Sequence, residues 1–78
     1  SMEDTELIAV KDAVRISEEL GQPISRFTII YAARNGFIAG ARKIGNVYTF
    51  SCKAFLDWMN DRPKPGPKPA KPEAPDAE

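Results

Sequence analysis

The sequence contains no histidine and only one cysteine, Cys52. A single cysteine cannot form an internal disulfide, and a chain without histidine lacks the Cys/His cluster that a structural zinc site requires. Because no imidazole can activate Cys52, we expect it to be a small packing residue and not a nucleophile. These absences predict a protein without a metal or cofactor, in a reducing cytoplasmic setting.

Long apolar runs are also missing. No stretch approaches the roughly 20 residues needed to cross a bilayer, and no signal-peptide pattern opens the chain. The sequence has no glycine-rich phosphate loop and no paired carboxylates in an apolar setting, and it is too short to enclose a sizeable pocket. We therefore expect neither a membrane protein nor an enzyme, and no small-molecule substrate.

Acidic residues are absent from the middle of the chain. The whole sequence is neutral, with 11 basic and 11 acidic residues, but residues 20–56 contain five basic residues and no acidic one. Residues 1–19 carry six acidic residues against two basic ones. Such an asymmetry is typical of a surface that binds nucleic acid, although five scattered positive charges can also form an ordinary solvated face.

Large apolar residues are missing from residue 63 onward, where the sequence is PKPGPKPAKPEAPDAE and holds six of the seven prolines. A segment with nothing to bury cannot offset the entropy cost of ordering, so we expect 63–78 to be disordered. We interpret it as a linker with polyproline II character; a ligand for aromatic grooves is the alternative. Residues 1–6, which begin with an expression remnant at Ser1-Met2, are expected to be disordered too, leaving a domain at 7–62.

Within that domain, apolar periodicity predicts a first helix at 10–20, ended by Gly21 and Pro23. A second helix is predicted at 25–35, with Ser25 as its cap and Asn35-Gly36 as its stop. Its expected inward residues are Ile29, Ala32 and Ala33, followed by Phe37 or Ile38. Two helices joined by a tight turn, the second basic and aromatic outside, predict a helix-turn-helix arrangement.

The remainder of the domain predicts a short hairpin and a third helix. Strand-forming residues flank Gly45-Asn46, which suits a two-residue hairpin turn at 41–50, with Ile44 and Phe50 pointing inward. Ser51 caps a third helix at 51–61. Its apolar stripe is Phe55, Trp58 and Met59. We expect Trp58 to contribute most to the core, packing with Phe55, Phe50, Ile44 and Ile29.

The ordered series of elements resembles the excisionase-type members of the MerR-like helix-turn-helix superfamily, and phage small terminase subunits are similar. The resemblance covers about residues 7–61, through SRFTI and RNGFI around the second helix, RKIGNVYTF in the hairpin and AFLDWM in the third helix. It implies a mostly α-helical winged helix-turn-helix fold, with the second helix in the major groove and the hairpin as a wing on the backbone or minor groove. It also implies a bacterial or phage protein, nucleoid-associated, that acts in excision, transcription regulation or DNA packaging.

The partner implied is double-stranded DNA. The candidate contacts are Ser25, Arg26, Thr28, Tyr31, Arg34, Arg42, Lys43 and Asn46. Arg26, near the start of the second helix, can bond a guanine edge through its fork or contact a phosphate instead, and both alternatives stay open. Arg34 and the two basic residues of the wing are expected at phosphates or an adjacent minor groove, with Asn46 at the wing tip. Tyr31 is expected as a contact, the alternative being a half-buried tyrosine with a local partner.

A different function class is a protein-interaction adaptor that keeps the winged-helix shape. Phe27 and Ile30, if exposed together, would form an apolar patch of the kind that marks a protein interface, including self-association. The proline-rich tail would serve the same role. The two hypotheses differ in whether Arg26, Arg34 and the basic residues of the wing lie on one face of the fold.

Overall fold

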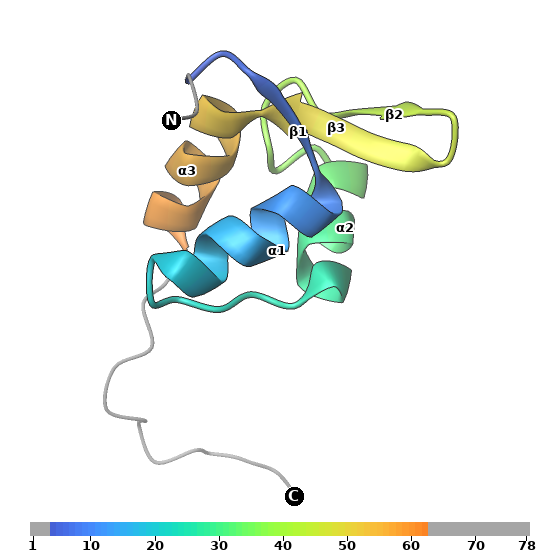
Figure 1. Ribbon diagram of the computed structural model, residues 1–78. Coiled ribbons are helices and arrows are strands. Elements are labelled where there is room, and N and C mark those ends of the chain that lie inside the picture. The colour runs from blue at the N-terminus through green and yellow to red at the C-terminus, as the bar shows by residue number, and fades with distance from the viewer. Residues whose placement is uncertain (1–3, 63–78) are drawn as a thin grey trace, which may run out of the picture.

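The computed structural model describes residues 4–62 of the chain. The elements, in order, are β1 (Leu7–Ala9), α1 (Val10–Glu19), α2 (Arg26–Arg34), β2 (Arg42–Ile44), β3 (Val47–Ser51) and α3 (Cys52–Asp61) (Figure 1). The protein is thus a mixed α/β domain of three helices and one small antiparallel sheet. The expected disorder of 63–78 and of the first three residues lies outside the described residues.

The three predicted helices are confirmed, and their ends have clear local causes. Ser25 Oγ accepts a hydrogen bond from the amide of Thr28 at 3.2 Å, which caps α2. Ser51 Oγ accepts one from the amide of Ala54 at 3.1 Å, which caps α3. Gly21, with φ of 78°, follows the C-cap of α1 in the left-handed conformation that glycine adopts at least cost.

The sheet has three strands in the order β1-β3-β2, so the expected two-stranded hairpin is only part of it. β1 pairs antiparallel with β3, placing Ile8 opposite Phe50, and β2 pairs with the outer edge of β3. The sequence does not predict β1, because it is three residues long and continues directly into α1. Three residues are too few to show an alternation of apolar and polar side chains. A two-stranded hairpin alone is only marginally stable, and β1 stabilises it by pairing with β3 next to the helices.

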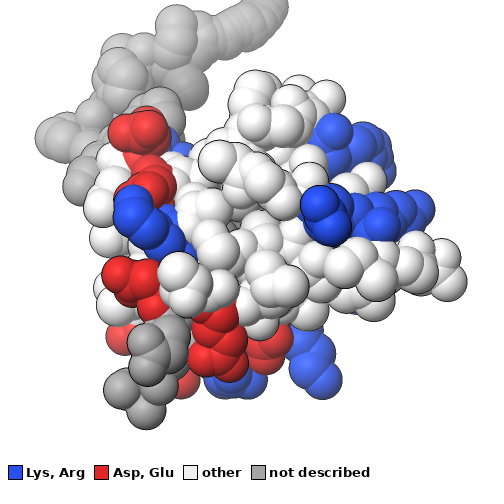
Figure 2. Space-filling model, turned by 90° about the horizontal axis from the view of Figure 1, so that it is seen from above, with Lys and Arg blue, Asp and Glu red and all other residues white. Residues whose placement is uncertain are grey.

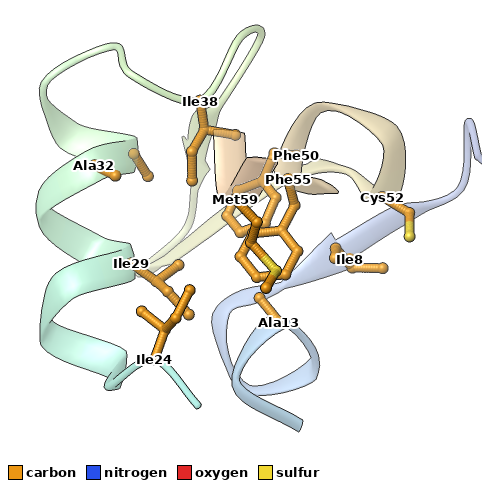
Figure 3. Close-up of a cluster of buried hydrophobic side chains, with 11 residues drawn as sticks. Ile8, Ala13, Ile24, Ile29, Ala32, Ile38, Phe50, Cys52, Phe55 and Met59 are labelled. Atoms are coloured by element: carbon orange, nitrogen blue, oxygen red, sulfur yellow. The ribbon is translucent and has the colours of Figure 1, made fainter. Parts of the chain in front are cut away.

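The core lies between the helices and the face of the sheet that carries Phe50 (Figure 3). Phe50 and Phe55 are fully buried, and their ring centroids are 5.9 Å apart. The other buried apolar residues are Ile8, Ala13, Ile24, Ile29, Ala32, Ala33, Ile38, Cys52 and Met59. The predicted inward stripe of α2 is therefore confirmed, and of the two residues offered to close it, Ile38 is the buried one.

Two expected core positions are wrong. Ile44 is 53% exposed, because it pairs with Val47 at the end of the hairpin that extends past the helices. Trp58 is only partly buried and packs at the margin of the core, 5.9 Å from the Phe55 ring, with the Arg62 guanidinium 5.0 Å from its own ring. The central place expected for Trp58 is taken by Phe50 and Phe55.

One buried serine holds the turn between α1 and α2. Ser17 is fully buried; its hydroxyl donates to the carbonyl of Val14 at 2.7 Å and accepts from the amide of Ile24 at 3.0 Å. The amide of Gln22 donates to the carbonyl of Ser17 at 2.9 Å. These bonds tie both sides of the turn to the last part of α1 and so fix where α2 begins.

The first described residues are bonded to the start of α3. The amide of Lys53 donates to the carbonyl of Asp4 at 2.8 Å, and the amide of Cys52 donates to the carbonyl of Glu6 at 2.9 Å. Amides at the start of a helix have no partner within it, so the N-terminal segment satisfies two of them. For residues 4–6, these bonds anchor a stretch expected to be disordered for lack of apolar side chains.

Candidate functional site

An open groove of about 410 Å³ lies where α1, α2 and the tip of the β2–β3 hairpin meet. Its lining consists of Val10, Lys11, Val14, Arg26, Ile30, Asn46, Val47 and Tyr48. Arg26 and Asn46, two predicted contact residues from different elements, border this groove together. Pairing within the sheet places the hairpin tip beside the first turn of α2, which no local pattern in the sequence could show.

The start of α2 is organised by hydroxyl groups. Ser25 Oγ bonds the amide of Thr28 and lies 3.1 Å from Thr28 Oγ1, so the two hydroxyls also bond one another. Arg26, the next residue, is exposed, and its guanidinium carbon lies 5.2 Å from the centroid of the Phe27 ring. Ser25 and Thr28 therefore cap the helix, while Arg26 is the exposed charged side chain of this turn.

The two basic residues of the hairpin are on opposite faces of the sheet. Lys43 pairs with Tyr48, and its ammonium lies 5.8 Å from the centroid of that ring, on the face that carries the groove. Arg42 pairs with Thr49, whose hydroxyl donates to the carbonyl of Arg42 at 3.4 Å. Because neighbouring residues of a strand alternate between faces, Arg42 points away from Lys43. Cationic groups thus flank both faces of the hairpin.

The predicted residues in the later part of α2 are exposed as well. Arg34 follows Arg26 by eight residues, which places it about 80° further round the helix axis at about 100° per residue. Tyr31 is 58% exposed, and its ring centroid is 6.1 Å from that of Phe37. The structure therefore brings Arg26 and Asn46 to the groove, with Lys43 beside the groove residue Tyr48. Arg34 lies further along α2 and Arg42 on the other face of the hairpin, so the four basic residues do not all share one face.

Ion pairing distinguishes these basic residues from Arg15 and Lys53, whereas Lys11 and Arg62 also have no carboxylate within 4.0 Å in residues 4–62. Within residues 4–62, the ion pairs are Arg15 with Asp12 at 3.5 Å, Arg15 with Glu19 at 4.0 Å, and Lys53 with Asp57 at 2.8 Å, all on α1 and α3. No described carboxylate lies within 4.0 Å of the basic groups of α2, β2 or β3. In Figure 2, groups of basic side chains lie at the right of the view without acidic neighbours, while the acidic side chains, with some basic ones beside them, lie at the left and bottom.

An aromatic surface adjoins the basic residues. Phe27, Tyr31 and Phe37 are 72%, 58% and 58% exposed, and we call these three residues the aromatic ridge. Sequence inspection expected Phe27 and Ile30 to form the exposed patch, but Ile30 is half-buried and lines the groove. The sequence did not identify Phe37 as exposed, because either Phe37 or its neighbour Ile38 could be the residue that enters the core. A run of two large apolar residues after a helix stop leaves that choice to the tertiary structure.

Among residues 4–62, two titratable groups have shifted pKa values, and both lie on α3. Burial raises the pKa of the Cys52 thiol, and the nearby charges of Asp4 and Glu6 add to the rise. The hydrogen bond from Lys53 to Asp57, and then the Asp57 charge, raise the pKa of the exposed Lys53 ammonium. A raised pKa keeps the thiol protonated, so Cys52 is a poor nucleophile.

The described part of the chain offers no group of three or more metal-ligating side chains. None of the helices between residues 4 and 62 is long and apolar enough to cross a membrane. Comparisons of the chain with protein-family models, with curated proteins and with solved structures give no match.

Proposed function

We propose that this chain binds double-stranded DNA as a winged helix-turn-helix domain, with α2 in the major groove and the β2–β3 hairpin as the wing. The observation that carries the proposal is the distribution of free positive charge: within residues 4–62, the basic groups of α2 and the hairpin have no carboxylate partner, whereas Arg15 and Lys53 are paired. Unpaired cations on adjoining elements are what phosphate neutralisation requires.

The dimensions of the elements suit this partner. α2 has nine residues and is therefore about 14 Å long, and a helix with its side chains is about 10–12 Å wide, close to the width of the major groove. Its inner residues pack on the core, which leaves the face with Arg34 and Tyr31 free. The hairpin extends sideways past the helices (Figure 1) and borders the same groove as Arg26. A duplex lying along α2 would therefore meet the hairpin tip as well.

Each basic residue has a distinct proposed role. Arg34, Arg42 and Lys43 contact phosphates, with the hairpin straddling a backbone because its two cations lie on opposite faces. Arg26 in the first turn of α2 either reads a guanine edge or contacts a phosphate. Tyr31 adds a contact from the exposed face of the helix, and Asn46 one from the hairpin tip. Ser25 and Thr28 act through capping, because their hydroxyls are already engaged.

A salt titration of DNA affinity tests the proposal. Replacing both Arg42 and Lys43 with glutamine should weaken binding to every DNA sequence alike and lower the salt slope by about one to two, since each lost phosphate contact removes about 0.9. Arg15→Gln and Lys53→Gln are the matched controls, because each removes one basic charge from α1 or α3. Both controls should leave the slope within about 0.5 of the wild-type value.

Arg26→Gln separates the two alternatives for that residue. A guanine contact should cost about 1–3 kcal/mol on a preferred site and much less on random DNA, whereas a phosphate contact should cost the same on both. Anisotropy titrations on a selected site and on a scrambled duplex provide the comparison. If the wild-type domain binds no duplex even at low salt, or if the control variants weaken binding as much as the double variant, the DNA proposal is wrong.

The aromatic ridge favours a second candidate function, that of a protein-interaction module. Three exposed aromatic residues on one surface resemble the anchors that dominate protein interfaces. In this case Phe27→Ser would abolish partner binding or self-association while the charge variants on the hairpin would not. Sedimentation equilibrium of the wild type and of these variants distinguishes the two, because DNA binding alone predicts no effect of Phe27→Ser on the mass of the free protein.

A further inference from the structure

A second groove, of about 430 Å³, runs beside α3, lies outside the proposed DNA-binding surface and shares Phe37 with the aromatic ridge. Its lining consists of Phe37, Ala39, Ala54, Asp57, Trp58, Asp61 and Arg62. The α3 members lie on successive turns of the helix and extend to its C-terminal end. The groove is therefore elongated along α3 and ends where the described chain ends.

The groove combines aromatic and acidic side chains with one basic residue, Arg62, whose guanidinium lies 5.0 Å from the centroid of the Trp58 ring. Trp58 is the only tryptophan of the chain and is partly exposed, and Phe37 is more than half exposed. Asp57 and Asp61 are both exposed, on one side of α3. Asp57 bonds Lys53 at 2.8 Å, whereas Asp61 has no basic partner within 4.0 Å in residues 4–62. Aromatic rings beside carboxylates can receive a segment that carries both proline and lysine.

Such a segment follows in the same chain. Residues 63–72, which continue directly from Arg62, have the sequence PKPGPKPAKP, with five prolines, three lysines and no acidic residue. Proline-rich segments are favourable ligands for aromatic grooves because polyproline II geometry is preformed and little entropy is lost on binding. The lysines complement the carboxylates of the groove.

We propose that this second groove, which we call the α3 groove, binds residues 67–72 of its own chain. The length is sufficient: six residues of polyproline II span about 19 Å at about 3.1 Å each, and the eight-residue step from Ala54 to Arg62 spans about 12 Å of helix. Residues 63–66 form the connection, and Gly66 supplies the conformational freedom that a reversal of direction needs. The segment then runs back along α3, with Lys68 near Asp61.

Tethering makes a weak contact sufficient. A short linker holds its ligand at an effective concentration in the millimolar range, so an interaction with a free Kd of about 1 mM is about half occupied within one chain. The occupied fraction should fall as salt rises, because the charges involved are exposed and screened. It should also be independent of protein concentration, which distinguishes binding within a chain from binding between chains.

Trp58 reports on the occupancy of the groove in the full chain. We expect Lys68→Glu and the double variant of Pro67 and Pro69 to alanine to raise the acrylamide quenching constant of Trp58, by up to about twofold if half of the molecules are occupied. Pro75→Ala, a proline outside the segment, is the matched control and should leave quenching unchanged. These changes lie beyond the described domain, so far-ultraviolet circular dichroism should stay the same.

A charge exchange tests the pairing itself. Asp61→Lys should raise Trp58 quenching, and combining it with Lys68→Glu should restore the wild-type value, because the swapped charges again attract. Nuclear Overhauser effects between the Trp58 indole and proline ring protons should be present in the wild type and absent in Lys68→Glu.

Two results would overturn the proposal. One is equal quenching in the wild type, Lys68→Glu and Pro75→Ala. The other is quenching that changes with protein concentration together with a dimer in sedimentation, which would place the segment on a second copy.

Discussion

The sharpest test of the fold is the removal of one hydroxyl group, in Ser17→Ala. Ser17 is fully buried, and its oxygen is the acceptor for the amide of Ile24, a residue only 7% exposed. The alanine leaves this amide without its partner in an apolar site, which costs about 1–3 kcal/mol. At about 0.05–0.15 kcal/mol per residue, a domain of residues 4–62 has a free energy of unfolding of about 3–9 kcal/mol. The loss is therefore a large fraction of the total.

Urea unfolding, followed by Trp58 fluorescence, measures this loss. With a slope of about 1 kcal/mol per molar urea, the midpoint should fall by about 1–3 M. Thr5→Ala removes a hydroxyl from an exposed residue and serves as the control, with an expected change within about 0.5 kcal/mol. Because Ser17 also fixes the start of α2, DNA affinity should decrease even under conditions where the variant is folded. A midpoint for Ser17→Ala equal to that of Thr5→Ala would refute this account of the turn.

Two further predictions concern the core and the cysteine. Phe55→Ala should lower the free energy of unfolding by about 3–5 kcal/mol and Trp58→Ala by less, since Phe55 is fully buried and Trp58 lies at the margin of the core. Urea midpoints measured by circular dichroism compare the two variants. A larger loss of stability for Trp58→Ala would contradict the packing described above. The raised pKa of the Cys52 thiol means that the folded state favours the protonated form, so its contribution to stability is full below the ordinary pKa of about 8.5 and falls as pH rises through the folded-state value. At pH 8 the thiol should therefore react with a disulfide reagent far more slowly than in urea, and equal rates would show that Cys52 is accessible.

Much of the local structure could be predicted from the sequence because its causes are local. The helix limits follow from Ser25, Ser51 and Gly21, each of which acts on backbone groups within a few residues. The hairpin turn follows from Gly45, whose φ of 62° suits the residue type. β1 was missed because a three-residue strand has no periodicity of its own and forms only by pairing with β3.

The candidate site divides in the same way. Residue type alone picked out the basic side chains of α2 and the hairpin, because an unbroken run of one charge sign is a property of composition. It could not show which of Arg42 and Lys43 shares a face with Tyr48, since strand register decides this, nor that Ile30 lines the groove while Phe37 is exposed.

Composition, capping residues and apolar spacing by themselves determined that three helices and a hairpin form between residues 7 and 62, since each of these signals acts over one or two turns of chain. Only the tertiary structure decided that Phe50 and Phe55 form the centre of the core and that Trp58 stays at its margin, where it borders a groove. The same holds for the meeting of Arg26 with Asn46, twenty residues apart. The physical reason is that burial depends on which faces meet when β1, β3 and the helices pack, and contacts between distant segments leave no trace in local spacing.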